Sequence, residues 1–247
     1  GSPVAFQSRL SDDAYGTALR DSLAADGVDL SRCLTGNEPT TLSVASLDAD
    51  GAATYTFYVD GTADRQAEPV PVSGGYAVFG TLSLALEPAS LRYAEAARLS
   101  ADAGAVVCLD PNIRPAFASE KHRLFLRGML VAVTVLKLSD EEVEFLGDTS
   151  HVPVVVTTLG GGGIRVRAPF GTAEVQAPQV EVADTIGAGD TVMAALVHQF
   201  DARGLDRCAL LDLGEEEWRE ILDFAARAAA VTVSRTGADT PYLHELG

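Results

Sequence analysis

The sequence predicts an α/β fold in which a mainly parallel sheet is covered by helices. Short, nearly continuous apolar runs rich in β-branched residues alternate with segments of helical periodicity. Strands of that composition are buried on both faces, which is typical of parallel sheets between two layers of helices. With 247 residues, 47% of them hydrophobic, the chain is long enough for one large domain with a small appendage.

The elements follow in order along the chain. Residues 3–6, PVAF, predict a first strand, and Ser11 is the expected N-cap of a helix that stops at Gly27. Further strands are predicted at 76–80, 105–110, 133–138 and 152–160, and further helices at 88–103, 140–146, 189–200 and 215–230.

Residues 38–68 break this alternation. Two segments of alternating polarity flank Asp48-Ala49-Asp50-Gly51, which predicts a β-hairpin. We interpret 38–68 as a small antiparallel β lid on a body made of residues 1–37 and 69–247. A dimer edge and a solvated surface hairpin remain alternatives for the same segment.

Two places in the chain look shortened. The sequence enters a strand and a helix at once, with nothing before them. Too few residues separate VEFLGD from HVPVVVTT for the crossover of about a dozen residues that parallel strands need. We therefore expect an N-terminal strand, and loops near 148–152, to be missing from this sequence.

Charge and composition narrow the classes of partner. The chain carries 18 Lys and Arg against 35 Asp and Glu, a net charge of −17, so it lacks the basic surplus that a nucleic-acid partner requires. Its three cysteines are widely spaced, which argues against a metal cluster or a disulfide framework. No apolar run approaches a membrane span of about 18 residues and no signal peptide is visible, so a reducing cytoplasm is the expected setting.

The stretch DTIGAGDTVMAALV, residues 184–197, places a turn of small residues before a helix that begins near Gly189. The first N–H groups of a helix lack intrahelical partners and carry partial positive charge, so residues 187–190 form an anion site. Asp190 lies at the mouth of this site. It is either a first-turn carboxylate stabilised by the helix dipole, or a general base that takes a proton from a hydroxyl beside a phosphate.

Two further strand ends carry candidate ligand residues. VVVTTLGGGG, residues 154–163, ends in a turn able to lie against a planar or phosphorylated ligand, although a plain hairpin turn explains its glycines equally well. CLDPNIRPAF, residues 108–117, holds Asn112 and Arg114 between two prolines at the carboxyl end of a strand, where open α/β sheets bind ligands. Arg114 either faces an anion or a polyol, or forms a structural salt bridge.

A third strand end opens a helix with acidic residues, in KLSDEEVEFL, residues 137–146. Asp140, Glu141 and Glu142 are either dipole partners of the first turn, or one of them reaches a phosphate-bound Mg²⁺ through water. The chain has no Walker A motif and no strand–GxGxxG–helix fingerprint, which argues against P-loop and NAD-binding proteins. Together, the strand ends favour phosphoryl transfer.

Six motifs resemble those of the ribokinase-type (PfkB) carbohydrate kinase family, and of its fructokinase branch in particular. In chain order they are FGTLSLA, LDPNIRP, KLSDEEVEFL, TLGGGG, DTIGAGD and AAAVTVSRTGA. DTIGAGD matches the family signature D-T-x-G-A-G-D, which is a specific pattern. The resemblance covers nearly the whole chain and implies an ATP-dependent sugar kinase with a Rossmann-like (ribokinase-like) α/β/α body and a β lid.

The resemblance also implies roles for individual residues. Asp190 would be the base that deprotonates the sugar hydroxyl, and Arg114 with Asn112 would face the substrate or the phosphates. The anion hole would be formed by the backbone N–H groups of Gly187, Ala188 and Gly189, and the nucleotide site would be lined by Thr158, Gly160 and Gly163.

Two ions enter through the same resemblance. Glu142 falls on the glutamate of the family's magnesium motif and would reach Mg²⁺ through water, with Ser139 where the family typically has asparagine. K⁺ or another monovalent cation would be held by carbonyls or groups near Asp184, Ile186, Ser234 and Gly237.

The expected reaction is transfer of the γ-phosphoryl group of ATP to a sugar hydroxyl, with fructose giving fructose 6-phosphate as the favoured case. 2-Keto-3-deoxygluconate kinase, ribokinase and nucleoside kinase remain alternatives, as does a non-catalytic sugar- or nucleotide-binding paralogue. The family's N-terminal sugar-binding segment is absent, and Val59 stands where fructokinases often carry arginine, so the reaction is better defined than the sugar. A homodimer through the lid is a further expectation from the resemblance.

Overall fold

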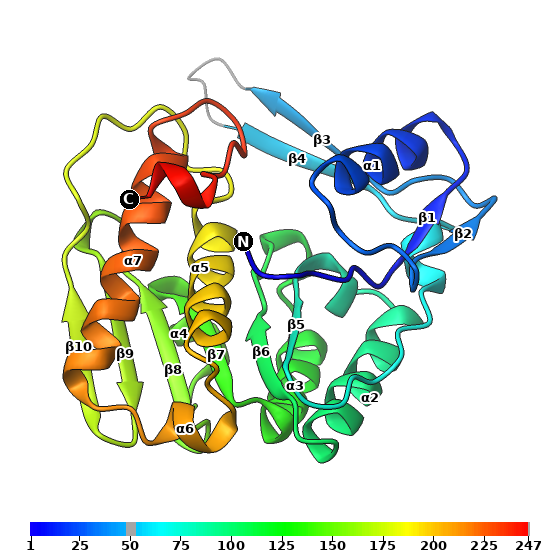
Figure 1. The fold of residues 1–247 in the computed structure, drawn as a ribbon. Helices are drawn as coiled ribbons and strands as arrows, with labels where there is room; N and C mark the ends of the chain where they lie inside the picture. Colours follow the sequence, from blue (N-terminus) through cyan, green and yellow to red (C-terminus); the bar gives the residue numbers. More distant parts are fainter. Residues whose placement is uncertain (48–52, 247) are drawn as a thin grey trace. The chain divides into compact units, whose positions relative to one another are not determined.

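The computed structural model describes residues 1–47 and 53–246, which form two compact units (Figure 1). Unit 1 comprises Gly1–Ser2, Pro71–Leu82 and Ala97–Gly247, and unit 2 comprises Pro3–Val70 and Ser83–Ala96. The predicted division into a body and a lid of 38–68 stays a prediction. All the residues predicted to form the site belong to unit 1.

Unit 1 is built on a six-stranded sheet with the strand order β10-β9-β8-β7-β6-β5 (Figure 1). Four neighbouring strands are parallel: β5 (Tyr76–Gly80), β6 (Val106–Asp110), β7 (Val135–Ser139) and β8 (Val154–Thr158). β9 (Ile164–Ala168) and β10 (Gly171–Val175) complete the sheet with antiparallel pairing. The prediction of a mainly parallel sheet is confirmed.

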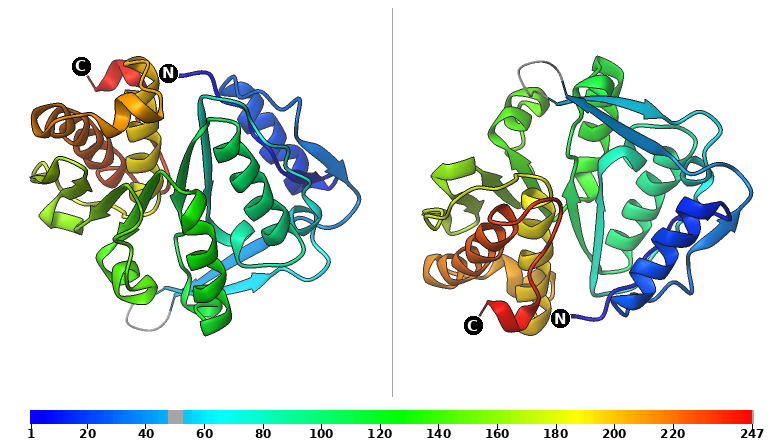
Figure 2. Two further views of the ribbon diagram at one scale, coloured as in Figure 1. Left: turned by 90° about the horizontal axis from the view of Figure 1, so that it is seen from below. Right: turned by 90° about the horizontal axis from the view of Figure 1, so that it is seen from above.

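Helices cover both faces of this sheet (Figure 2). α5 (Ala188–Ala202) and α7 (Glu215–Val233) lie on one face, and α3 (Glu120–Met129) and α4 (Asp140–Leu146) lie on the other. The short α6 (Arg207–Leu211) connects α5 to α7, and α2 (Ala89–Asp102) passes from unit 2 into unit 1. The layered α/β/α arrangement is confirmed, although the sequence patterns missed α3 and α6.

The connection between β7 and β8 corrects one expectation. These two strands are parallel, and the crossover between them is α4 itself, followed by the segment 147–153. Arg167 donates through Nη2 to the carbonyls of Thr149 (2.9 Å) and Val152 (3.0 Å), which fixes that segment. The argument that too few residues separate these strands for a crossover is wrong, because the helix predicted at 140–146 already provides it. That loops near 148–152 are missing from this sequence stays a prediction.

Unit 2 contains two small sheets and one helix. β1 (Arg9–Ser11) pairs in parallel with β2 (Leu34–Gly36), and α1 (Ala14–Ala25) connects them. β3 (Leu42–Leu47) and β4 (Ala53–Tyr58) form the predicted antiparallel hairpin, with Leu42 opposite Tyr58. The turn predicted at Asp48 to Gly51 lies outside the described residues.

The start of unit 2 differs from the sequence prediction in two respects. Residues 3–6 form no strand of their own, and only Ala5 makes a single parallel bridge, to Asp29. The N-cap of α1 is Asp13 rather than Ser11, because Ser11 ends β1 while the Asp13 carboxylate accepts from Gly16 N–H at 2.8 Å. Gly27 follows the helix with a φ of 75°, as expected for a residue that ends a helix.

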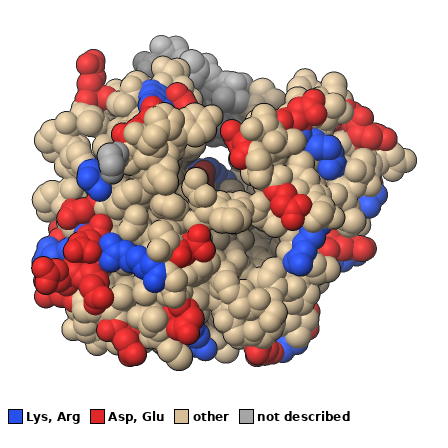
Figure 3. All heavy atoms as spheres, in the orientation of Figure 1, with Lys and Arg blue, Asp and Glu red and all other residues tan. Residues whose placement is uncertain are grey.

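Acidic and basic side chains are interspersed on the face shown in Figure 3, including the region over α6 and the start of α7. Ion pairs account for part of this pattern, such as Arg219–Glu215 along α7 and the pair between Arg203, which follows α5, and Glu220 of α7. Among the described helices, none is both long enough and apolar enough to cross a membrane.

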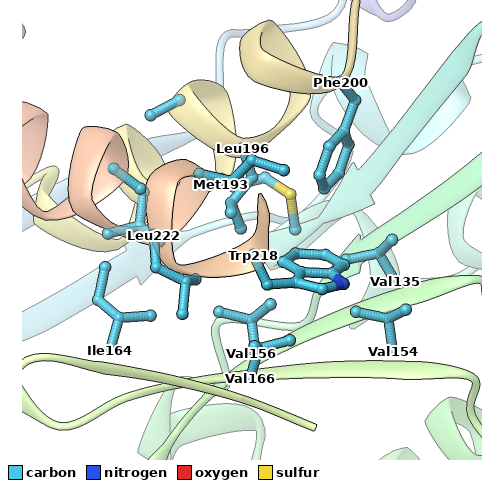
Figure 4. Packing of buried hydrophobic residues seen from close by; sticks show 14 of the residues in the cluster. Val135, Val154, Val156, Ile164, Val166, Met193, Leu196, Phe200, Trp218 and Leu222 are labelled. Carbon is cyan, nitrogen blue, oxygen red and sulfur yellow. The ribbon is translucent and has the colours of Figure 1, made fainter. Parts of the chain in front are cut away.

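The hydrophobic core of unit 1 lies between the sheet and the α5–α7 pair (Figure 4). Trp218 of α7 is fully buried, and its ring meets Phe200 of α5 edge-on, with centroids 5.8 Å apart and an interplanar angle of 82°. The sheet contributes Val154, Val156, Ile164 and Val166 beneath Met193, Leu196 and Leu222. This packing fixes the course of α5 across the sheet and therefore the position of its first turn.

Candidate functional site

The turn before α5 requires glycine at one position. Gly187 is the N-cap of α5 and has a φ of 81°, a left-handed conformation that side chains disfavour. A Cβ at this position would also lie 3.3 Å from the Cβ of Ala238. Thr191, one turn into α5, supports the turn by donating its hydroxyl to the carbonyl of Gly187 at 2.9 Å.

Backbone N–H groups at this helix start are available to a ligand. The N–H of Ala188 makes a long bond of 3.3 Å to the carbonyl of Thr185. Within the described part of the chain, no hydrogen bond is found from the N–H groups of Gly187, Gly189 or Asp190. These donors and the helix dipole make the turn a site for an anion. Asp190 itself is exposed on the first turn.

A buried ion pair lies next to this turn. Lys137 of β7 donates through Nζ to Oδ2 of Asp110, at the end of β6, at 2.6 Å, and the two side chains are only 5% and 7% exposed. A Cβ at Gly189 would lie 2.9 Å from that Nζ, so the Lys137 ammonium is directly against the first turn of α5.

The Asp110 carboxyl is strongly perturbed by its surroundings. Burial raises its pKa to about 6, the Lys137 ammonium opposes that rise, and the carboxylates of Glu142 and Asp190 add to it. Its second oxygen, Oδ1, is buried without a hydrogen-bond partner among the described residues. Asp110 and Lys137 were missed as a pair by the sequence analysis. The available signal was a lysine inside an otherwise apolar strand.

Glu142 holds the loop after β6 against the start of α4. Its Oε1 accepts from Ile113 N–H at 2.6 Å and its Oε2 from Ser139 N–H at 2.8 Å, the second bond closing a capping box. Asn112 in the same loop has a φ of 42°, and Arg114 is exposed. No ion pair of Arg114 is found among the residues that the structure describes, so the salt-bridge alternative for it finds no support there.

Asp184 ties the turn before α5 to the segment after α7. Its Oδ1 accepts from Ile186 N–H and its Oδ2 from Gly237 N–H, both at 3.0 Å. These two backbone bonds lower the pKa of the Asp184 carboxyl. The structure thus brings Asp184, Ile186 and Gly237 together, while the Ser234 hydroxyl donates to the carbonyl of Val231 in its own helix.

One pocket, of about 390 Å³, is lined by two of the regions predicted to bind ligands, the glycine turn and the start of α5. Thr158, Gly160 and Gly163 line it from the turn between β8 and β9, and Ala188 and Gly189 line it from the start of α5. Its remaining wall is largely apolar and comes from the segment before α5 and from α7, with Val180, Val182, Ala226, Ala230 and Val233. Pockets of this kind, apolar with a few convergent polar groups, are typical of small-molecule sites.

The glycine turn that lines this pocket is also a β-hairpin turn. β8 and β9 pair in antiparallel fashion, and Leu159 N–H donates to the carbonyl of Gly163 at 2.9 Å. Gly163 has a φ of 106°, and a Cβ there would lie 2.0 Å from the carbonyl oxygen of Val175. The two interpretations left open for these glycines are therefore compatible.

Asn112, Arg114 and Glu142 do not line the pocket, and neither do Asp190, Asp184, Ile186, Ser234 and Gly237. The contact of Gly189 with Lys137, which bonds to Asp110, nevertheless places the ends of β6 and β7 next to the start of α5. No group of three or more His, Cys, Asp or Glu side chains able to hold a metal ion occurs in the described ranges.

Comparisons with known proteins show which family the chain resembles in sequence. The model of the pfkB family of carbohydrate kinases matches residues 1–245. A fructokinase from Rhizobium leguminosarum bv. trifolii is 33% identical over 216 residues, which cover 80% of this chain and 66% of that protein. Probable fructokinase-2 from Arabidopsis thaliana is 28% identical over 260 residues, covering 96% of this chain and 78% of its own length.

Solved structures extend the likeness to the fold. The crystal structure of a fructokinase with bound ATP from Xylella fastidiosa matches with a TM-score of 0.90 at 26% identity, covering all of this chain and 84% of that one. An aminoimidazole riboside kinase from Salmonella enterica matches with a TM-score of 0.83 at 22% identity, covering 100% of this chain and 85% of that one.

Proposed function

Because this chain belongs to the pfkB family of carbohydrate kinases, we propose that it transfers the γ-phosphoryl group of ATP to a hydroxyl group of a sugar. The observation that carries the proposal is the first turn of α5. Free backbone N–H groups there lie beside an exposed carboxylate, Asp190, and the same turn closes one side of the pocket. Phosphoryl transfer needs an anion site and a proton acceptor in this proximity.

In this mechanism the pocket binds ATP. The nucleoside lies against the apolar wall, and Thr158, Gly160 and Gly163 contact it from the β8–β9 turn. The phosphates extend to the start of α5, where Gly187, Ala188 and Gly189 form the anion hole. Ala188 then exchanges its long bond to Thr185 for the ligand. The N–H groups and the helix dipole stabilise charge on the oxygens of the transferring group.

Asp190 is the proposed general base. Its carboxylate takes the proton from the attacking sugar hydroxyl while the hydroxyl oxygen bonds to the γ-phosphorus and the bond from that phosphorus to the leaving oxygen of ADP breaks. Asp190 is repelled by a bound phosphate, but only a carboxylate this close to the phosphoryl group can accept the proton of the attacking hydroxyl. Arg114 and Asn112 are proposed to face the sugar or the phosphates.

Two ions, Mg²⁺ and a monovalent cation, are also proposed to bind at this site. Mg²⁺ keeps several waters and is carried mainly by nucleotide phosphates, which agrees with the lack of a side-chain metal cluster in the part of the chain described. Each Glu142 oxygen accepts one N–H group and keeps a lone pair that suits a metal-bound water. Bound there, Mg²⁺ would neutralise phosphate charge. We place the monovalent cation, K⁺ for example, near Asp184, Ile186, Ser234 and Gly237.

Fructose is the proposed substrate, with fructose 6-phosphate as the product. The support is that the curated relatives cited above are named fructokinases, at 28–33% identity. 2-Keto-3-deoxygluconate, ribose and nucleosides are the competing acceptors. We also propose that residues 38–68 act as a lid that excludes water, that the lid mediates a homodimer, and that the enzyme works in the cytoplasm.

The test is an ADP-release assay of wild type and Asp190→Asn with saturating ATP and each candidate sugar. We expect wild type to release ADP with fructose, and the variant to turn over 10²- to 10⁴-fold more slowly, since general bases typically contribute that factor. Asp201→Asn, at the exposed far end of α5, is the matched control and should stay near wild type.

Two results would contradict the proposal. Turnover of Asp190→Asn within about tenfold of wild type would remove the base assignment. ATP binding without ADP release for any sugar would favour the non-catalytic paralogue instead.

A further inference from the structure

Two threonine hydroxyls connect α7 to the carbonyl of Gly187 at the start of α5. Thr191 of α5 donates its hydroxyl to that carbonyl at 2.9 Å, and the hydroxyl oxygen of Thr232 in α7 lies 2.9 Å from the same Thr191 oxygen. Thr232 is fully buried and Thr191 is only 5% exposed. The packing of α7 on α5 therefore brings a second hydroxyl to the turn that carries the proposed anion hole.

The hydroxyl protons have one favourable arrangement. Each hydroxyl has a single proton to donate. The other acceptor near Thr232 is the carbonyl of Ala228, one turn earlier in α7, at 3.4 Å, which is longer than a normal O–H···O hydrogen bond. Thr232 therefore donates to Thr191, and Thr191 donates to Gly187. We call this chain of two hydrogen bonds the threonine relay.

The helices do not need the relay for their own hydrogen bonding. A threonine that bonds to the carbonyl four residues earlier is common in helices and has no function by itself. Here, however, the carbonyl of Gly187 already accepts the N–H of Thr191 at 2.8 Å. Replacing a buried hydrogen-bonded pair by apolar groups of the same shape is often nearly neutral, so the packing of α5 on α7 gives little reason for two hydroxyls at this place.

The peptide that accepts the relay also carries a donor of the anion hole. The carbonyl of Gly187 and the N–H of Ala188 belong to one planar trans peptide, so the two groups point in opposite directions. Because the carbonyl is held along α5 toward Thr191, the N–H of Ala188 points out of the helix start. The present bond of that N–H, to the carbonyl of Thr185, is long at 3.3 Å.

The relay has two effects on this peptide. Gly187 is in the left-handed region with a φ of 81°, and glycine has the largest backbone freedom, so additional hydrogen bonds to its carbonyl restrict the rotation of the peptide. Hydrogen bonds in a chain also polarise one another, so a carbonyl that accepts the relay makes the N–H at the other end of its peptide a stronger donor.

We propose that Thr191 and Thr232 are positioning residues for phosphoryl transfer, which hold and polarise the peptide between Gly187 and Ala188 through the threonine relay. This role rests on the proposed function, because it presupposes that the N–H of Ala188 stabilises the transferring phosphoryl group. Charge on that group develops in the transition state, so the relay acts on kcat more than on the binding of ATP. Thr232 acts only through Thr191.

The test is a kinetic double-mutant cycle of Thr191→Val, Thr232→Val and the double variant in the ADP-release assay. Valine keeps the branched shape and removes the hydroxyl, whereas Thr191→Ser and Thr232→Ser keep the hydroxyl and serve as rescue variants. Thr134→Val is the matched control, because Thr134 is buried just before β7 and no side-chain hydrogen bond of it is found among the described residues. Urea unfolding checks that each variant is folded, and alanine replaces valine in any variant that is not.

We expect Thr191→Val to lower kcat about 10-fold, near the upper end of the range for one hydrogen bond, and to change the KM for ATP less than about threefold. Thr232→Val should lower kcat about threefold in wild type but leave it within about 1.5-fold in the Thr191→Val background, since residues of one network are not additive. Both serine variants and Thr134→Val should stay within about twofold of wild type.

Three results would overturn the relay. They are an unchanged kcat in the folded valine variants, an effect of Thr232→Val that is equal in both backgrounds, and serine variants as slow as the valine ones. A rise in the KM for ATP without a fall in kcat would also overturn the role in phosphoryl transfer. A wild type that releases no ADP with any sugar would overturn this role together with the proposed function.

Discussion

Gly189 has no side chain, and this leaves space on both sides of the first turn of α5, toward Lys137 and toward the pocket. It lies inside α5, where alanine is normally more stable than glycine by about 0.5–1 kcal/mol. A methyl group there would, however, lie 2.9 Å from Lys137 Nζ, the far end of a flexible side chain that can move aside. The lack of a side chain at this position therefore makes room for the Lys137 ammonium, and we propose that it also makes room for the phosphates of the ligand.

Gly189→Ala should therefore separate stability from binding. We expect the free energy of unfolding in urea to stay equal or rise by up to about 1 kcal/mol, while ATP binds more weakly because the added methyl group crowds the proposed anion hole. Gly128→Ala is the matched control, since Gly128 lies in α3 with no atom near its added methyl. A variant of Gly189 that binds ATP as well as the Gly128 variant would refute this explanation.

Asp110 should leave a signature in the pH dependence of stability. Its pKa is raised from 3.8 to about 6, so the folded protein holds the proton more tightly than the unfolded chain does. The contribution of Asp110 is therefore fully present below pH 4 and is lost as the pH rises through 6. Relative to Asp110→Asn, wild type should lose about 1–2 kcal/mol of unfolding free energy between pH 5 and pH 7.5.

Urea unfolding of both proteins at the two pH values measures this difference. Because the other titrating groups are shared, their contributions largely cancel in the comparison. If the difference in unfolding free energy between wild type and Asp110→Asn were the same at both pH values, or favoured wild type at the higher pH, the pKa of Asp110 would not be raised in the folded protein.

At the scale of elements, the turns around the site are fixed by side chains that bond to backbone. Glu142 connects the start of α4 to the loop after β6 through Ser139 and Ile113 N–H groups. Asp184 connects the turn before α5 to Gly237 beyond α7. These carboxylates position the strand ends relative to one another. We therefore expect their removal to raise amide exchange in the loops that they hold, and not in the core.

Glu142→Ala should cost about 1–3 kcal/mol of unfolding free energy, because two backbone N–H groups lose their acceptor. Ser139→Ala removes only the cap bond of α4 and should cost about 1 kcal/mol. Amide exchange of Ile113 distinguishes the two variants, since only Glu142 bonds to it. Equal exchange of Ile113 in both would mean that the loop is held by something else.

The sequence predicted those elements whose residues carry a local pattern. β5 to β8 and α4, α5 and α7 were found because apolar runs and helical periodicity are local. The helix α3, EKHRLFLRGM, was missed since it follows a proline-rich loop and is largely charged. The first N-cap was misassigned because Ser11 and Asp13 both suit a cap, and only the extent of β1 decides between them.

In the candidate site, too, the residues in short local motifs were predicted and those that depend on the tertiary fold were not. The candidate residues of the two turns and Asp190 stand in short motifs and were predicted. Five of them line one pocket: Thr158, Gly160, Gly163, Ala188 and Gly189. The pairing of Lys137 with Asp110 depends on the order and register of β6 and β7, in which Leu109 pairs with Leu136, one residue before each partner. Such a contact, 27 residues apart in sequence, has no local signature.

At the scale of the whole molecule, the fluorescence of one tryptophan reports the unfolding of unit 1 separately from that of unit 2. Trp218 is the only tryptophan of the chain and is fully buried in the core of unit 1 beside Phe200. Its fluorescence therefore reports the unfolding of that unit. The pocket proposed for ATP is lined by residues of unit 1 alone.

ATP without any sugar should consequently stabilise unit 1. A ligand that binds only the folded state at 100 times its Kd adds about 2.7 kcal/mol to the free energy of unfolding. We expect urea unfolding followed by Trp218 fluorescence to shift by this amount. Asp190→Asn should shift at least as much, because the substitution keeps the pocket and removes a charge that repels the phosphates. Stabilisation that appears only when fructose is added would show that unit 1 does not complete the nucleotide site by itself.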